Sequence, residues 1–407
     1  MSLPSRRPSP FTSLFLIVHF VCYISAIHHL RDEFGECKLN SDGASISNTS
    51  DASNINRKSQ HIFRELAPAL SSRTDLVKHE RVPPDHIHEV LFAVEQRNLD
   101  VLTEMLHDIS DPNSSNYGRH KSRAEIEAIS SNPESHDAII RYLVESGATV
   151  TSQSLNGEYI TAHAPISLWE DLLKTEFFVF HYTQSRGDTV IALVRAEEYS
   201  VPRDLHRHVA SVFQTIQMPL SIWGNPVIHG IVDNHSDIHA NLVTGYISPE
   251  ILKYQYEIVD DGTGSNKSTQ AAFGSIGAFF SPQDLTSFQN RFNLTVQPVT
   301  TFVGGHSNDD VCTFAPELCS ESNLDIQNLM GTSQYSPTTH WYTDNNSFAN
   351  WLLEVANIEN PPLVISISYG TDEDKVSKGE FDAFNLQAIK LGLRGVTIIV
   401  SSGGEML

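Results

Sequence analysis

Two continuous apolar runs near the end of the sequence constrain the fold most strongly. They are "PPLVISISYG" (361–370) and "VTIIVSSGG" (396–404), and the stretch between them, 380–395, has helical character. Apolar strands that are separated by a helix are typical of a parallel sheet covered by helices on both faces. The sequence therefore predicts an α/β domain over 246–407.

Cap residues and apolar spacing predict further elements of this domain. Ser248-Pro249 and Ser281-Pro282 have the pattern of helix starts, with serine as the N-cap and proline in the first turn. We expect helices over 248–258, 281–294, 322–331 and 348–358, and a strand of small residues over 271–280.

Short strands and helices alternate in the region 81–218, which predicts an α+β domain. Ser122 and Glu125 form a capping-box pattern, and Ser135 is the expected cap of a helix that stops at Gly147. Asn156-Gly157 predicts a hairpin turn.

Polar stretches flank this α+β region on both sides. Residues 27–80 are rich in Ser, Asn and Asp and predict a flexible segment, and 219–245 predict a linker between domains.

The first 26 residues have the composition of a secretory signal peptide. Arg6 and Arg7 precede an apolar run at 14–24, and a small-residue sequence ends at Ala26. A retained anchor is the alternative, although the run is too short to span a bilayer comfortably. We expect a protein of the secretory pathway, either lysosomal or extracellular.

The charge balance excludes some classes of partner. Lys and Arg total 27 against 49 Asp and Glu, which gives a net charge of −22. Such a chain is a poor ligand for nucleic acid or an anionic membrane surface. In an acidic compartment, protonation of carboxylates and of the 19 histidines would relieve the self-repulsion.

Cysteines and glycosylation signals agree with a secretory route. Cys312 and Cys319 are close enough in sequence to close a small loop, while Cys22 lies in the signal and Cys37 is left over. Asn-x-Ser/Thr acceptor patterns for glycosylation occur at Asn48, Asn113, Asn234, Asn266, Asn293 and Asn345.

Glu321 and Asp325 form the strongest candidate for a catalytic site. Their spacing places both carboxylates on one face of the predicted helix. If that helix is buried, two close carboxylates share protons, as a general base that works in acid requires. Spacing alone favours the alternative of a solvated acidic face, because such pairs are common.

Several stretches, in this order along the chain, resemble the sedolisin family of serine-carboxyl peptidases, on its tripeptidyl-peptidase branch. Residues 91–120 are similar to the start of the family's activation prodomain, and 247–258 to the start of its catalytic domain. "ESNLDIQNLM" (321–330) resembles the family's Glu-x-x-x-Asp helix. "VISISYGTDED" (364–374) and "GLRGVTIIVSSG" (392–403) resemble the strands before its active-site loops.

The resemblance implies a subtilisin-like α/β fold behind an activation prodomain at 81–218, with a processing site in the linker. It implies that Glu321 is the general base for a serine nucleophile and that Asp325 supports Glu321. The activity implied is release of tripeptides from free N-termini of peptides at acidic pH. No cofactor is expected in this chain, because the family's calcium site lies further towards the C-terminus.

The sequence departs from the family's pattern at 402–405. The family has Ser-Gly-Asp-Ser-Gly there, and its aspartate supports the oxyanion. Here Gly404 stands at the position of that aspartate, and no Ser-Gly-Thr-Ser nucleophile motif is present. We therefore expect only the N-terminal half of the catalytic domain, and no peptidase activity from it alone.

Two alternatives have different functions. The chain could be a non-catalytic inhibitor or chaperone of a full-length paralogue, acting through its prodomain. A glycosidase that uses Glu321 and Asp325 is disfavoured, because one helical turn sets them side by side and does not let them flank a bond.

Two weaker candidates have simpler explanations. The acidic run 372–374 follows a strand, where ligands collect, but an acidic first turn of a helix is favoured. His306 with Asp309 and Asp310 could suggest a metal site, but no second pair of ligands is spaced nearby, so we expect no metal and a polar loop.

Overall fold

The computed structural model describes residues 61–68, 70, 73–183, 190–219, 247–258, 267–275, 277–343, 347–371 and 373–401. The chain divides into the units Met1–Arg57 and Lys58–Leu407, and all described residues belong to the second unit. The predicted signal peptide, almost all of the predicted linker and the stretch 402–405 lie outside the described residues. Within the described part, no helix combines the length and apolarity that crossing a membrane requires.

In the described part of the N-terminal region, 61–219, the chain forms three antiparallel sheets and four α-helices. The largest sheet has the order β4-β5-β3-β9, and the others are β2-β6-β7 and β1-β8. The strands are β1 (His61–Leu66), β2 (Leu76–Arg81), β3 (Ile87–Val94), β4 (Thr149–Gln153), β5 (Tyr159–Pro165), β6 (Phe178–Thr183), β7 (Val190–Arg195), β8 (Glu198–Pro202) and β9 (Val209–Phe213). The helices are α2 (Leu99–Ser110), α3 (Arg123–Ser130), α4 (Pro133–Glu145) and α5 (Ile166–Leu173).

Most local signals in this region predicted the right structure. Ser122 and Glu125 form the capping box at the start of α3. The hairpin of β4 and β5 turns at Asn156-Gly157, where Gly157 has a φ of +66°. That backbone conformation suits glycine because it has no Cβ.

Two expectations for the N-terminal region were wrong. Helix α4 starts at Pro133, and its cap is Asn132, whose side chain accepts the N–H of Ser135. Proline in the first turn fixes the start three residues earlier than expected, and Ser135 is buried beside His208. The predicted flexible segment 27–80 is also too long, because β1 and β2 lie within its last twenty residues.

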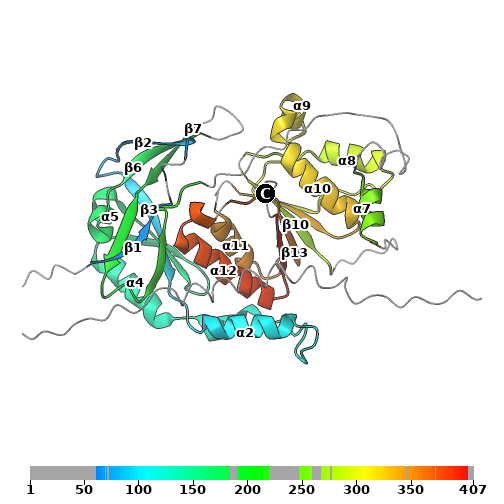
Figure 1. The fold of residues 1–407 in the computed structure, drawn as a ribbon. Coiled ribbons are helices and arrows are strands. Elements are labelled where there is room, and N and C mark those ends of the chain that lie inside the picture. Colours follow the sequence, from blue (N-terminus) through cyan, green and yellow to red (C-terminus); the bar gives the residue numbers. More distant parts are fainter. Residues whose placement is uncertain are drawn as a thin grey trace, which may run out of the picture. The chain divides into compact units, whose positions relative to one another are not determined.

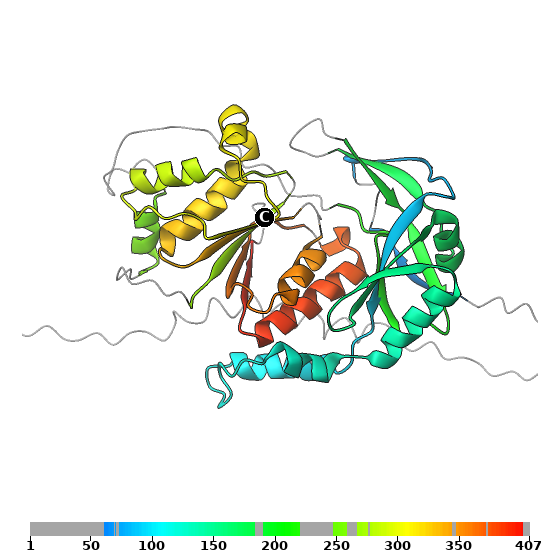
Figure 2. The ribbon, with the colours of Figure 1, turned by 180° about the vertical axis from the view of Figure 1, so that it is seen from behind.

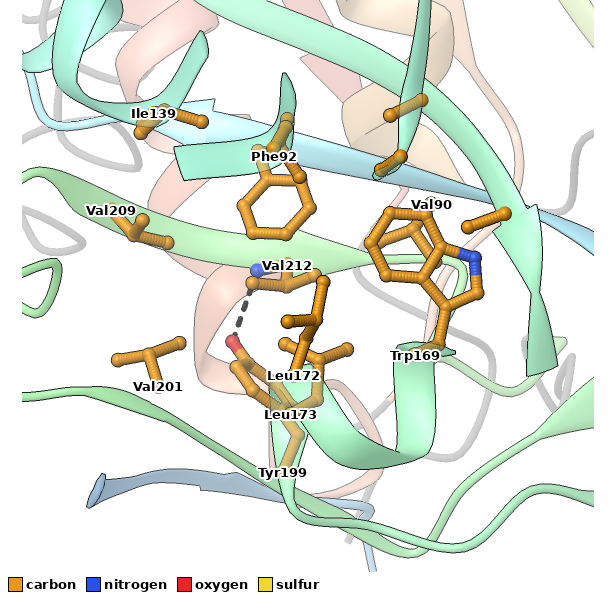
Figure 3. Packing of buried hydrophobic residues seen from close by; sticks show 14 of the residues in the cluster. Val90, Phe92, Ile139, Trp169, Leu172, Leu173, Tyr199, Val201, Val209 and Val212 are labelled. Atoms are coloured by element: carbon orange, nitrogen blue, oxygen red, sulfur yellow. Dashed lines mark hydrogen bonds between the residues drawn. The ribbon is translucent and has the colours of Figure 1, made fainter. Parts of the chain in front are cut away.

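A core of aromatic and branched side chains holds the N-terminal sheets and helices together. Figure 3 shows Phe92 of β3 and Trp169 of α5 packed among aliphatic residues. The hydroxyl of Tyr199 accepts the backbone N–H of Val212 at 3.0 Å and donates to the Glu65 carboxylate at 2.8 Å. Burying a tyrosine is favourable when its hydroxyl has such partners.

The C-terminal region, 247–401, is built on a five-stranded parallel sheet in the order β11-β12-β10-β13-β14. The strands are β10 (Gln270–Ser275), β11 (Thr301–Val303), β12 (Thr338–Thr343), β13 (Val364–Ile367) and β14 (Thr397–Val400). The helices are α7 (Pro249–Gln255), α8 (Pro282–Arg291), α9 (Asp309–Phe314), α10 (Ser320–Thr332), α11 (Phe348–Asn357) and α12 (Lys378–Leu393), with short 3-10 turns at Pro316–Leu318 and Glu373–Lys375.

Helices cover both faces of this sheet, as the sequence predicts. Figures 1 and 2 show α7, α8 and α10 on one face and α11 and α12 on the other. Side chains of β10 alternate accordingly: Phe273 packs with Trp351 under α11, while Ala272 packs with Leu285 and Ile326 under α8 and α10.

Strand β14 differs from the expectation of a strand buried on both faces. It lies at the edge of the sheet and pairs with β13. Ile399 and Val400 are 48% and 46% exposed. No part of the described chain covers these side chains.

Helix α12 joins the two regions because it is packed on two sides. Ala388 and Leu391 face the parallel-sheet core, whereas Ala383 packs with Tyr159 and Phe213 of the N-terminal region. A helix with apolar residues on more than one side is expected to be buried.

Polar contacts fix the position of α12 on the N-terminal region. The Lys390 ammonium forms a buried ion pair with Glu158, and Gln96 and Gln387 also contact this pair. The Glu65 carboxylate accepts the N–H of Gly379 in the first turn of α12 at 2.6 Å. A carboxylate at a helix N-terminus is favourable because the unpaired N–H groups there carry partial positive charge.

Gly379 has no space for a side chain in this contact. A Cβ there would lie 2.0 Å from Ser211 Oγ and 2.6 Å from Ser211 Cβ. We expect Gly379→Ala to lower the free energy of unfolding by about 1–3 kcal/mol, measured by urea denaturation. In a Ser211→Gly background the cost should be smaller, and equal costs in the two backgrounds would contradict this contact.

Glu380 should make stability depend on pH. Burial raises its pKa to about 7, against the opposing effects of Ser347 and Arg195 and with a smaller contribution from Glu65. The stability that a protonated Glu380 contributes is therefore present below about pH 4 and is lost as the pH rises through 7. We expect Glu380→Gln to be more stable than the unsubstituted chain near pH 8, by up to about 3 kcal/mol, and equally stable near pH 4.

Urea denaturation at several pH values measures this difference. Asp382→Asn is the matched control, because Asp382 is on the same helix but exposed to solvent. If the free energy of unfolding changes with pH in the same way for Glu380→Gln and for the unsubstituted chain, Glu380 does not cause the pH dependence.

Candidate active site

Helix α10, which carries Glu321 and Asp325, is anchored at its start. The Cys312–Cys319 disulfide, whose Cα atoms are 5.5 Å apart, closes the predicted loop directly before the helix. Asn323 accepts the N–H of Ser281 at 2.9 Å and donates to Asp284 at 2.8 Å. These contacts tie the first turn of α10 to the start of α8 and so set its rotation.

Both predicted carboxylates lie on this helix and are half-buried. Their spacing of four residues corresponds to a rise of about 6 Å along the axis, with both side chains on one face. Ser368 donates its hydroxyl to Asp325 Oδ1 at 2.6 Å. A hydrogen bond of this length fixes the relative position of the two groups, so Ser368 orients Asp325.

The contact between Asp325 and Ser368 lies where parallel sheets usually hold their ligands. Ser368 follows β13, and Ser275 ends the neighbouring strand β10. The chain leaves β10 towards β11 on one side and leaves β13 towards β14 on the other. Such a divergence between adjacent strands is the usual position of an active site in open α/β sheets.

Small and neutral groups let α10 sit close to the sheet. A Cβ on Gly274 of β10 would be 3.3 Å from His340 Nε2 and 3.5 Å from Ser322 Oγ. Burial lowers the pKa of His340 to about 4, and His306 contributes in the same direction. His340 is therefore neutral above the acidic range and adds no positive charge beneath the helix.

The weaker sequence candidates have structural contacts of their own. Asp309 Oδ1 accepts the Ser281 hydroxyl at 2.7 Å and the Gln283 N–H at 3.0 Å, and the His306 ring stacks on Tyr342. In the described ranges, no group of three or more His, Cys, Asp or Glu is placed to hold a metal ion. Asp372 lies outside those ranges, and Glu373 begins a short 3-10 turn.

Sequence reasoning missed Ser368. It is the first polar residue after the apolar run of β13, at the carboxyl end of a parallel strand. That position is a general signal for site residues, although the sequence does not reveal that the partner of Ser368 is Asp325.

Sequence comparisons find relatives for this combination of elements. Residues 74–218 match the family of pro-kumamolisin activation domains. Tripeptidyl-peptidase 1 of Dictyostelium discoideum is 27% identical and covers 77% of this chain, and that of Homo sapiens is 26% identical and covers 79%. Physarolisin of Physarum polycephalum is 27% identical and covers 83%.

The chain spans little more than half of these relatives, namely 56% of the Dictyostelium protein and 57% of the other two. A solved structure of an epidermin leader peptide processing serine protease from Staphylococcus aureus is 10% identical, covering 77% of this chain and 60% of its own, with a TM-score of 0.32. A likeness at that level supports no conclusion about the fold.

An activation domain followed by a parallel-sheet region is thus present in a chain whose relatives are named as peptidases. The chain is similar to tripeptidyl-peptidase 1 and to physarolisin, and residues 74–218 match the pro-kumamolisin activation domain. The domain boundaries at 81–218 and 246–407, and the catalytic roles of Glu321 and Asp325, stay predictions.

Ser368→Ala tests the contact with Asp325. Loss of a hydrogen bond to a charged group should lower the free energy of unfolding by about 1.5–3 kcal/mol, measured by urea denaturation at neutral pH. The cost should shrink in an Asp325→Asn background. Ser366→Ala, two residues earlier on β13, is the matched control and should cost less.

Proposed function

We propose that the chain carries the base-bearing half of a sedolisin-type peptidase site. In this proposal, Glu321 takes the proton of a serine nucleophile, and Asp325 supports Glu321 by sharing its negative charge or a proton. The position of both carboxylates on one face of α10, with Asp325 bonded to Ser368 at the carboxyl end of β13, carries the proposal.

The use of a carboxylate as the base explains a preference for acid. A glutamate accepts a proton only when it is ionised, and its ordinary pKa is far lower than that of histidine. The site would therefore act at a lower pH than one built on a histidine base. We extend this to release of N-terminal tripeptides from peptide substrates, which the names of the relatives support.

We further propose that the 407-residue chain does not catalyse this reaction alone. Its sequence contains no Ser-Gly-Thr-Ser motif, and Gly404 stands where the family has its oxyanion aspartate. Without a nucleophile, peptidases of this kind lose on the order of 10⁶-fold in kcat.

The signal-like residues 1–26 support a secretory or lysosomal location for the protein, with glycosylation at acceptor asparagines. Of the acceptors, Asn113 and Asn293 fall within the described residues, and both are exposed.

The alternative function, inhibition or chaperoning of a full-length paralogue, is less well supported. Glu65, Glu158 and Tyr159 of the N-terminal region contact α12 of the same chain. A paralogue would have to displace α12 before it could use this surface.

Hydrolysis of a fluorogenic tripeptide substrate near pH 4 tests the proposal. The 407-residue chain should give no turnover above background. A chimera that joins residues 1–401 to the remaining C-terminal part of Dictyostelium tripeptidyl-peptidase 1 should be active. In the chimera, Glu321→Gln should lower kcat by about 10³-fold or more.

Leu324→Ala is the matched control in the chimera, because Leu324 lies on the same helix and is 51% exposed. It should leave kcat almost unchanged. If the 407-residue chain hydrolyses the substrate and Glu321→Ala abolishes that activity, the chain is not inactive and this part of the proposal is wrong. If the chimera is active and Glu321→Gln leaves its kcat unchanged, Glu321 is not the base.

A further inference from the structure

A small cavity lies between the N-terminal region and the helices of the C-terminal region. Its volume is about 100 Å³. A water molecule occupies about 30 Å³ in the liquid, so the cavity could hold about three waters or one small ion. Its polar lining consists of Arg195, Gln214 and Gln217 on one side and Ser347, Asn350 and Glu380 on the other.

Arg195 brings a positive charge with unused donors to this cavity. Its Nε donates to the carbonyl oxygen of Gln217 at 2.6 Å, and its Nη1 donates to that of Val194 at 2.7 Å. A guanidinium has five N–H donors, so three of them have no acceptor within the described ranges. Burial lowers the pKa of Arg195 to about 10, so the group stays charged at physiological pH.

The charged groups around Arg195 do not neutralise it in acid. Glu380 faces it across the cavity but forms no ion pair with it in the described part of the chain, and the Ser377 hydroxyl contacts Glu380 at 3.4 Å. Burial raises the pKa of Glu380 to about 7, and Glu65 is the other carboxylate near it. His88 near Arg195 is neutral because burial lowers its pKa to about 4. Arg73, which donates to the carbonyl oxygen of Pro219 in the cavity lining, is paired with Asp75.

We propose that this cavity binds a small carboxylate anion, held by the unused N–H donors of Arg195. Gln214 and Asn350 line the same space, and in this proposal their side-chain amides supply further donors. A planar carboxylate suits a guanidinium because two parallel hydrogen bonds can form. This site is separate from Glu321 and Asp325 and does not depend on the proposed peptidase function.

The site would hold the two regions together. Arg195 and Gln214 belong to the N-terminal region, whereas Asn350 and Glu380 belong to α11 and α12. A ligand that binds only when these groups are assembled stabilises the assembled chain. Ionised Glu380 repels an anion, so binding should be stronger in acid than at neutral pH.

Thermal denaturation of the 407-residue chain with sodium acetate as the probe tests the proposal, against sodium chloride at equal ionic strength. Near pH 5.5, saturating acetate should raise Tm by about 2–5 °C more than chloride does. Near pH 8 the difference in Tm between acetate and chloride should be smaller for the unsubstituted chain. The Glu380→Gln variant should show the full difference at that pH. Arg195→Met should abolish the difference between acetate and chloride, whereas Arg207→Met, an exposed arginine with a side chain 76% accessible, should not.

Asn350→Leu is a second variant, in case Arg195→Met does not fold. The leucine side chain takes up space in the cavity, while Arg195 and Glu380 stay in place. This variant should reduce the difference in Tm between acetate and chloride. Equal effects of acetate and chloride on the unsubstituted chain would mean that the cavity holds only water and would overturn the proposal. An acetate effect that Asn350→Leu leaves intact, or that is larger near pH 8, would overturn it as well.

Discussion

Burial of α12 on two sides is the constraint on which the rest of the described structure depends. One side of the helix completes the core beneath the parallel sheet through Ala388 and Leu391, and the other packs on the N-terminal sheets. The Glu158–Lys390 pair lies inside this second contact. A buried ion pair is costly to separate, because each charge would lose its partner in a poorly hydrated place. The Glu158–Lys390 pair therefore fixes the position of α12 on the N-terminal region.

This arrangement has a consequence for the candidate site. The face of the sheet that α12 covers is opposite to the face that α10 covers. Glu321 and Asp325 lie on the helix that the disulfide, Asn323 and Ser368 position. Contacts from the N-terminal region act on the other face, through α12. Helix α10 carries the candidate carboxylates, and helix α12 contacts the N-terminal region.

Much of the fold was predictable because its signals are local. Continuous apolar runs predicted the parallel strands β13 and β14, and the capping box at Ser122 fixed a helix start. The failures have physical reasons. Ser135 looked like a cap, but Pro133 lets the helix begin earlier, with Asn132 as the cap. Strands β1 and β2 sit in a polar stretch, and their sheet partners come from distant residues such as 178–202.

The sequence by itself determined that Glu321 and Asp325 share a helical face, since four residues make about one turn of helix. It also determined the order of strand, helix and strand over 361–404, where two continuous apolar runs flank a helical stretch. Only the tertiary structure decided that Ser368 donates to Asp325 across 43 positions and that Glu65 caps α12 across 314. Such contacts depend on which side chains packing brings together, and periodicity along the chain carries no information about that.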